Sequence, residues 1–220
     1  MSQRFLAPAV ALAAVAVLAL PAAFSYALIS TLPARAEAVD PEPPKPIEPP
    51  AALPKVQHGD KTQNLDRLFE ALKVAPDDDS AKYVENRIWA IWLATPSDTA
   101  SLLMSRVKIA SEAKDFDLAI KLLDAIIDLK PDYIEAWNRR ATIFYMKKDF
   151  ARSIADIHEV LAREPRHFGA LSGLGIILQE IGDEKEALVA FRRALAIHPH
   201  LERIPDLVKK LADKIDGRDI

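Results

Sequence analysis

The chain has 220 residues, of which 29 are basic and 32 acidic, for a formal net charge of −3 at pH 7. This mildly acidic balance argues against nucleic acid as the main partner, because phosphate contacts require a basic surface. The sequence contains no cysteine, which excludes disulfides, thiolate metal sites and cysteine nucleophiles. Its five histidines and six glycines offer little material for a catalytic or phosphate-binding centre.

The first 36 residues have the pattern of a targeting segment. Arg4 is followed by 30 uncharged, mostly apolar residues, and a small-x-small cleavage site ends at Ala36. These features are typical of a secretory signal peptide. However, residues 5–32 are also long enough to tether the chain in a bilayer, which requires about 20 apolar residues. Residues 1–36 are therefore predicted to be a signal peptide or an N-terminal membrane anchor. Both place the remainder in the periplasm, either free or anchored in the cytoplasmic membrane.

Residues 37–62 are predicted to be a proline-rich disordered linker. Seven of the sixteen prolines lie between residues 41 and 54, and proline removes backbone donors and prevents helix formation. Such a segment favours extended polyproline II, which rises about 3.1 Å per residue. We expect a semi-rigid spacer. The alternative is a ligand for an aromatic groove, because P-x-x-P spacings occur in the segment.

The rest of the chain repeats every 34 residues. Prolines, aspartates and small residues recur at this spacing (Pro131, Pro165 and Pro199; Asp115, Asp149 and Asp183; Ala119, Ser153 and Ala187). A fixed period of this length indicates a solenoid of helix–turn–helix units. Each proline is expected to end a second helix, because the residue before a proline avoids the helical conformation. Each aspartate is expected to cap the first turn of the following helix.

This pattern resembles the tetratricopeptide repeat (TPR) family. Units 100–133, 134–167 and 168–201 match its consensus, and the third matches best through its apolar and small residues (Leu171, Leu174, Gly175, Leu178, Ala187, Phe191, Ala194 and Pro199). The resemblance implies an all-α, right-handed helical solenoid of three TPR hairpins. It also implies a non-catalytic protein–protein interaction module. Within the units, we expect Trp137 and Phe191 to be core residues and Gly175 to permit close helix packing.

Both ends of such an array need a cap, because each unit leaves an apolar face exposed. Residues 203–217 are predicted to form a C-terminal capping helix, with Pro205 in its first turn. Residues 63–98 are predicted to form a degenerate helical hairpin, whose second helix begins near Asp77. We expect this hairpin to cover the first repeat.

TPR arrays hold a peptide or helix in a concave groove lined by first helices, and the resemblance implies the same for this chain. Mapping that face gives eight candidate partner-binding residues: Lys108, Asn138, Arg139, Thr142, Tyr145, Ser172, Ile176 and Gln179. Their amide, guanidinium and phenol groups suit a peptide backbone or a carboxylate. The alternative is an ordinary solvated surface. The basic clamp for C-terminal carboxylates is not reproduced, since Gly169 and Gly173 occupy its place.

Two other functions stay open at this stage. One is a structural assembly factor for an envelope membrane complex, acting through the convex face or the ends of the solenoid. The other is an anion or small-molecule sensor that uses Arg106 and Arg140, which lie one repeat apart. The alternative for these arginines is pairing with acids such as Asp124 or Asp156.

No enzyme activity, cofactor or metal site is predicted. His198 and His200 flank Pro199, but two imidazoles without a third ligand make a poor metal site. The glycines near residue 170 follow no strand and are not a phosphate loop. The partner is therefore expected to be a protein or peptide, whose identity the sequence does not give. Nor does the sequence give the oligomeric state.

Overall fold

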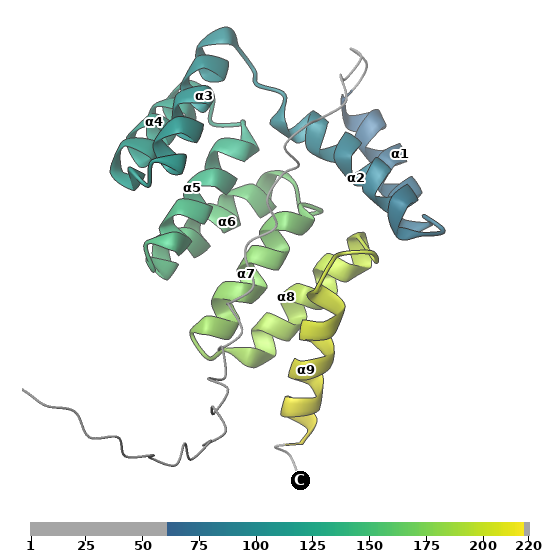
Figure 1. Cartoon of the computed structure of the whole chain (residues 1–220). Helices are drawn as coiled ribbons and strands as arrows, with labels where there is room; N and C mark the ends of the chain where they lie inside the picture. Colours follow the sequence, from purple (N-terminus) through teal and green to yellow (C-terminus); the bar gives the residue numbers. More distant parts are fainter. Residues whose placement is uncertain (1–60, 218–220) are drawn as a thin grey trace, which may run out of the picture. The chain divides into compact units, whose positions relative to one another are not determined.

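The computed structural model describes residues 61–217, so the predicted signal or anchor and nearly all of the predicted linker lie outside the described residues. The chain divides into two units, Met1–Pro41 and Glu42–Ile220, and every described residue belongs to the second. All regular secondary structure in the described range is helical, which confirms the predicted all-α class. The helices are α1 (Lys61–Lys73), α2 (Asp78–Leu93), α3 (Asp98–Glu112), α4 (Phe116–Leu129), α5 (Ile134–Met146), α6 (Phe150–Arg163), α7 (Phe168–Glu180), α8 (Glu184–Ile197) and α9 (Ile204–Asp216) (Figure 1).

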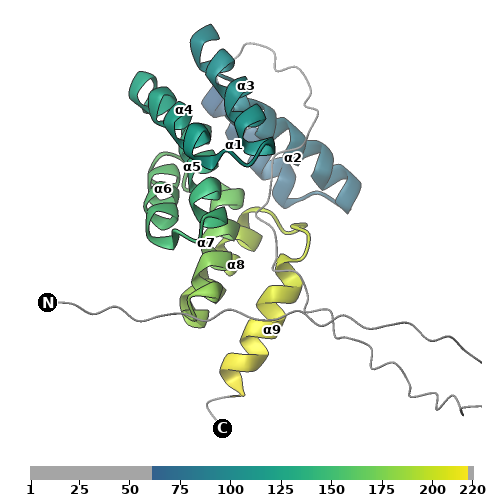
Figure 2. The ribbon, with the colours of Figure 1, turned by 60° about the vertical axis from the view of Figure 1, so that its left-hand side comes forward.

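The three predicted repeats form hairpins that stack in series. Helices pair as α3–α4, α5–α6 and α7–α8, and successive hairpins meet through α4–α5 and α6–α7. Helix α9 packs on α8 and continues the series (Figure 2). It starts at Ile204 with Pro205 in its first turn, as predicted for the capping helix. None of the described helices is long and apolar enough to span a bilayer.

The turn inside each hairpin has the same chemistry. The side chain of each repeating aspartate accepts a hydrogen bond from the backbone N–H three residues later, at 3.1 Å for Asp115 and Asp149 and 3.3 Å for Asp183. This confirms the predicted N-caps. The preceding residue has a positive φ in each case: 57° at Lys114, 59° at Lys148 and 87° at Gly182. In the third repeat, glycine adopts this conformation without steric cost.

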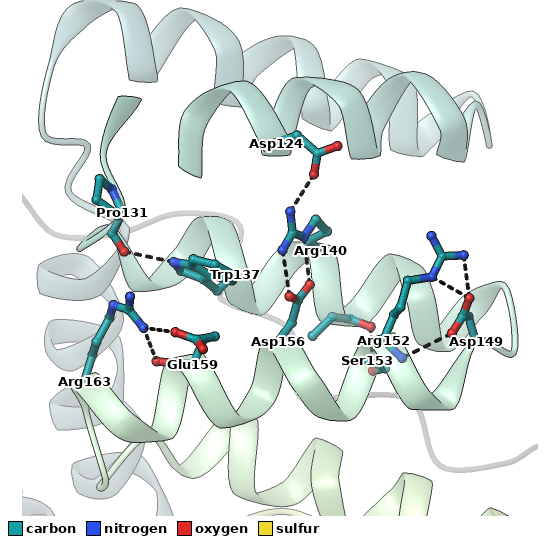
Figure 3. Close-up of polar contacts among 11 residues, drawn as sticks. Asp124, Pro131, Trp137, Arg140, Asp149, Arg152, Ser153, Asp156, Glu159 and Arg163 are labelled. Carbon is teal, nitrogen blue, oxygen red and sulfur yellow. Dashed lines mark hydrogen bonds and ion pairs between the residues drawn. The ribbon is translucent and has the colours of Figure 1, made fainter. Parts of the chain in front are cut away.

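The predicted core residues differ in burial. Phe191 is fully buried, and a Cβ added to Gly175 would lie 2.5 Å from its ring, so this glycine permits the close approach of α7 and α8. Trp137 is only half-buried. Its indole N–H donates to the carbonyl of Pro131 at 2.9 Å, and the guanidinium of Arg140 lies 4.9 Å from its ring centre (Figure 3). Trp137 thus packs against the buried core without being fully buried, so the prediction of a core position is confirmed only in part.

The N-terminal hairpin α1–α2 does not cover the first repeat, and that prediction is wrong. Its buried side chains, including Phe69, Trp89 and Trp92, share one hydrophobic cluster with α5 to α9. A separate cluster joins α3, α4 and the side of α5 that carries Ala136 and Ile143. The reason is the bulk of the α2 tryptophans, which pack on Phe168 at the start of α7 with ring centres 5.5 and 5.2 Å apart.

Candidate protein-interaction site

The predicted groove residues lie on the three first helices. Lys108 belongs to α3, Asn138 to Tyr145 belong to α5, and Ser172 to Gln179 belong to α7. The structure leaves Lys108 exposed and half-buries Asn138, Arg139, Thr142 and Gln179. The other three are buried, with exposed fractions of 8% for Tyr145, 0% for Ser172 and 2% for Ile176. A groove open over all eight residues is therefore not present.

Hydrogen bonds within the chain occupy the polar groups of the buried members. The Tyr145 hydroxyl donates to the carboxylate of Glu180, which also accepts a bond of 2.8 Å from Lys148. Burial and this bond to Glu180 raise the pKa of Tyr145. The hydroxyl of Ser172 donates to the backbone carbonyl of Phe168 at 2.8 Å. These two hydroxyls already have partners inside the chain.

Between α5 and α7 lies a fully buried Glu–His pair that the sequence analysis missed. The ring Nδ1 of His167 accepts from the backbone N–H of Ala170 at 3.0 Å and thereby caps α7. The proton of a neutral ring then resides on Nε2, which donates to the carboxylate of Glu135 at 3.0 Å. The amide of Asn138 also donates to Glu135, at 3.3 Å. Asn138 therefore supports the internal packing.

Helix α2 lies over this pair. The Trp92 ring stacks on His167, with ring centres 4.1 Å apart and an interplanar angle of 11°. A Cβ added to Gly169 would lie 3.0 Å from the Trp89 ring, so the glycine admits the indole. The Tyr133 hydroxyl donates to the carbonyl of Leu93, the last residue of α2, at 3.1 Å. The N-terminal ends of α5 and α7 are thus occupied by a helix of the same chain.

Polar contacts tie the hairpin to two inter-repeat turns. Arg166 pairs with Asp66 of α1 at 2.7 Å. His200 lies 2.7 Å from Asp78 and 3.1 Å from the carbonyl of Ala75. Burial alone would raise the pKa of Glu85, but His198 at 3.5 Å, Lys82 at 3.1 Å and the indole of Trp89 lower it below its usual value.

A cleft of about 1000 Å³ opens beside the docked hairpin. It runs between α2 and the turns that contain Pro131 and Pro165, and Trp92, Tyr133 and Arg166 are among its lining residues. The indole N–H of Trp92 is buried without a hydrogen-bond partner. The cleft is bounded by the hairpin and the turns, whereas the predicted groove residues lie on the first helices.

The two arginines of the sensor hypothesis have different environments. The guanidinium of Arg140 bonds Asp124 at 2.5 Å and both oxygens of Asp156 at 2.8 Å, which confirms the expected pairing with acids (Figure 3). The bond to Asp156 is the main cause of the raised pKa of Arg140. Arg106 is exposed on α3. The structure thus gives no recessed cationic pair for an anion.

No group of three or more metal-ligating side chains is found among residues 61–217. His198 and His200 instead lie beside Glu85 and Asp78 of α2, at 3.5 and 2.7 Å. Their role in the structure is to hold the hairpin against the turn after α8.

Comparisons with known proteins agree with this architecture. The family model for the tetratricopeptide repeat matches residues 105–157 and 149–202. A TPR repeat-containing protein of Rhizobium etli is 43% identical over 155 residues, which are 70% of this chain and 76% of that protein.

Solved TPR domains share the fold at low sequence identity. The first TPR domain of Spaghetti (RPAP3), solved with an HSP90 peptide, superposes with a TM-score of 0.52 at 19% identity, over 56% of this chain and 98% of that one. The TPR2B domain of yeast Sti1, in a complex with pHsp70, gives 0.50 at 18% identity, over 54% and 99%. These likenesses show the predicted helical solenoid, and with the relative from Rhizobium etli they establish that the chain belongs to the tetratricopeptide repeat family.

Proposed function

We propose that this TPR protein is an exported, non-catalytic interaction module that binds a partner peptide or helix along the part of its first helices that α2 leaves open. The observation that carries the proposal is a row of equivalent residues at the C-terminal ends of α3, α5 and α7. Glu112, Met146 and Glu180 are 34 residues apart and are all exposed. Lys108 and the half-buried Thr142 and Gln179 lie on the same helices and extend this row.

The chemistry of the row favours a neutral or basic partner segment. Glu112 and Glu180 place carboxylates at its two ends, and Lys108 and Lys148 pair with them at 3.8 and 2.8 Å, so the lysines beside the row are not available to an acidic peptide. Met146 is 44% exposed, and methionine adapts its shape to apolar side chains of a partner. The RPAP3 and Sti1 domains carry their peptide or protein partners on the same fold. That precedent supports peptide binding here, although the partner chemistry differs from an acidic chaperone tail.

Export is the second part of the proposal. It rests on the targeting pattern of residues 1–36, and it places the folded domain in the periplasm or holds it at the cytoplasmic membrane facing the periplasm. The structural-assembly alternative stays a second candidate, because α3 and α4 carry exposed leucine and isoleucine side chains at one end of the array.

A site-specific photo-crosslinker tests the binding surface in intact cells. We expect a crosslinker at Met146 to yield one discrete adduct, and a crosslinker at Arg192, which is exposed on the second helix α8, to yield none. Glu112→Lys should then weaken binding of the captured partner about fivefold or more, as the loss of complementary charge typically does. An adduct formed from Arg192 and absent from Met146 would favour assembly through the convex face.

A further inference from the structure

Helix α3 exposes an apolar face that the equivalent helices bury. Ile109, Ile143 and Ile177 occupy the same repeat position, with exposed fractions of 66%, 2% and 2%. Leu102 is 63% exposed, whereas its equivalents Ala136 and Ala170 are 0% and 1% exposed. In α5 and α7 this face belongs to clusters shared with the preceding hairpin. Hairpin α1–α2 packs elsewhere, so the corresponding face of α3 is uncovered.

Helix α4 adds an apolar stripe to the same end of the array. Leu118, Leu122, Ala125 and Leu129 recur at helical spacing, and Leu118 and Leu129 are 45% and 46% exposed. The four equivalent positions of α6 are all charged (Arg152, Asp156, Glu159 and Arg163), and Figure 3 shows all four in ion pairs within their own repeat. The first repeat therefore carries leucine and alanine where the second repeat carries a salt-bridged surface.

The exposed apolar face of α3 and the apolar stripe of α4 form one continuous surface. In the second repeat, Arg140 of α5 bonds Asp156 of α6, so these two repeat positions are adjacent. The same register places Arg106 of α3 beside Leu122 of α4. We call this surface the end face, and define it by Leu102, Arg106, Ile109, Leu118, Leu122 and Leu129. Arg106 is exposed within it and supplies its positive charge.

The second repeat shows how an equivalent surface is covered within this chain. Helix α4 packs on α5, and its Asp124 bonds Arg140, the equivalent of Arg106, at 2.5 Å. We propose that the end face binds an acidic amphipathic helix of a partner protein, which packs on α3 as α4 packs on α5 and places a carboxylate against Arg106. Exposed contiguous apolar surface of this kind marks interaction sites in soluble proteins. This surface is distinct from the row at Met146.

Charge favours a different protein over a second copy of this chain. A two-fold contact through the end face would bring two copies of Arg106 together. A head-to-tail contact would place Arg106 against α9, which exposes both lysines (Lys209 and Lys210) and aspartates (Asp206, Asp213 and Asp216). The two-fold contact opposes like charges and the head-to-tail contact meets mixed charges, whereas an acidic helix supplies the charge that Asp124 supplies to Arg140.

A peptide with the sequence of α4, residues 116–129, is a suitable probe, because it contains Asp124 and an apolar stripe. We expect the fluorescently labelled peptide to bind the purified chain saturably, as followed by anisotropy. Arg106→Glu should weaken binding about tenfold, since complementary charge is then replaced by repulsion. Arg192→Glu is the matched control, because Arg192 is exposed on α8, and it should leave binding unchanged. A peptide with Asp124→Lys should bind the Arg106→Glu chain more tightly than the wild-type chain.

Three results would overturn the proposal. They are the absence of peptide binding, equal losses for Arg106→Glu and Arg192→Glu, and a concentration-dependent dimer in sedimentation that Ile109→Asp abolishes. The last result would assign the end face to a second copy. Circular dichroism verifies that each variant keeps its helicity, which the exposure of Arg106 and Ile109 leads us to expect. Met146→Ala should leave peptide binding intact, so this test and that of the proposed function fail independently.

Discussion

Gly173 and Gly175 lie two residues apart on α7, but their surroundings differ. A Cβ at Gly175 would lie 2.5 Å from the buried ring of Phe191, whereas a Cβ at Gly173 would meet only Ile157, at 3.9 Å. We expect Gly175→Ala to lower the free energy of unfolding by about 1–3 kcal/mol, because overpacking forces the rigid ring to move. Gly173→Ala should raise it by up to about 1 kcal/mol, because alanine favours a helix interior.

Urea denaturation followed by circular dichroism measures both glycine variants. Gly173→Ala serves as the control for helix propensity, since both substitutions add the same methyl group to the same helix. If Gly175→Ala were as stable as Gly173→Ala, the close approach of α7 and α8 at Phe191 would be contradicted.

The sequence predicted which residues cap helices or permit close packing better than it predicted how exposed each side chain is. The aspartate caps and Gly175 follow from local geometry, which the 34-residue period repeats in every unit. The burial of Tyr145 and Ile176 depends instead on which other elements cover α5 and α7. A repeat consensus does not report contacts between neighbouring first helices, such as the bond from Tyr145 of α5 to Glu180 of α7, so these two residues were expected on an open surface.

At the scale of elements, the sequence predicted the N-terminal hairpin but not its position. The aspartates at 77–79 indicate where α2 begins, and Asp77 does cap it. Two of the docking contacts, Asp66 with Arg166 and Ala75 with His200, join residues 100 and 125 positions apart. Apolar periodicity reports which face of a helix is buried and does not report its partner. The end face of α3 and α4 is uncovered as a result of this placement.

The docking of α1–α2 should depend on pH through His200. Both ring nitrogens face acceptors, the carboxylate of Asp78 and the carbonyl of Ala75, so the charged imidazolium is favoured. The bond to Asp78 is the main cause of the raised pKa of His200, and partial burial opposes it. A raised pKa in the folded state stabilises docking below the unfolded value of about 6.5, and this stabilisation is lost as pH rises through the folded value.

We therefore expect the urea midpoint of the hairpin, followed by fluorescence of Trp89 and Trp92, to fall as pH rises above about 6.5. His200→Gln should remove most of this dependence. His158→Gln is the matched control, because His158 is exposed on α6 away from the described hairpin contacts, and it should keep the dependence. An unchanged pH profile in His200→Gln would show that another group is responsible.

At the scale of the whole molecule, the position of the docked hairpin on the TPR fold determines which parts of the surface are covered and which are left for partners. The hairpin covers the N-terminal ends of α5 and α7, which leaves the row at Glu112, Met146 and Glu180 for a partner segment. Because the hairpin shares the cluster of the later repeats, the first repeat keeps an uncovered end. Because α1–α2 packs on the later repeats and not on the first repeat, it reduces the predicted groove on the first helices and leaves the end face of α3 and α4 exposed.

The last prediction concerns the segment before the described domain. The Ala-x-Ala site that ends at Ala36 predicts cleavage before Glu37, because signal peptidase sites require small residues there. N-terminal sequencing of the exported protein should therefore begin at Glu37. Ala36→Leu should block processing, whereas Ala38→Leu, which lies beyond the site, should not. Recovery of an intact chain with Met1 from the membrane fraction of wild-type cells would contradict cleavage and establish residues 5–32 as an anchor, with the folded domain held at the membrane.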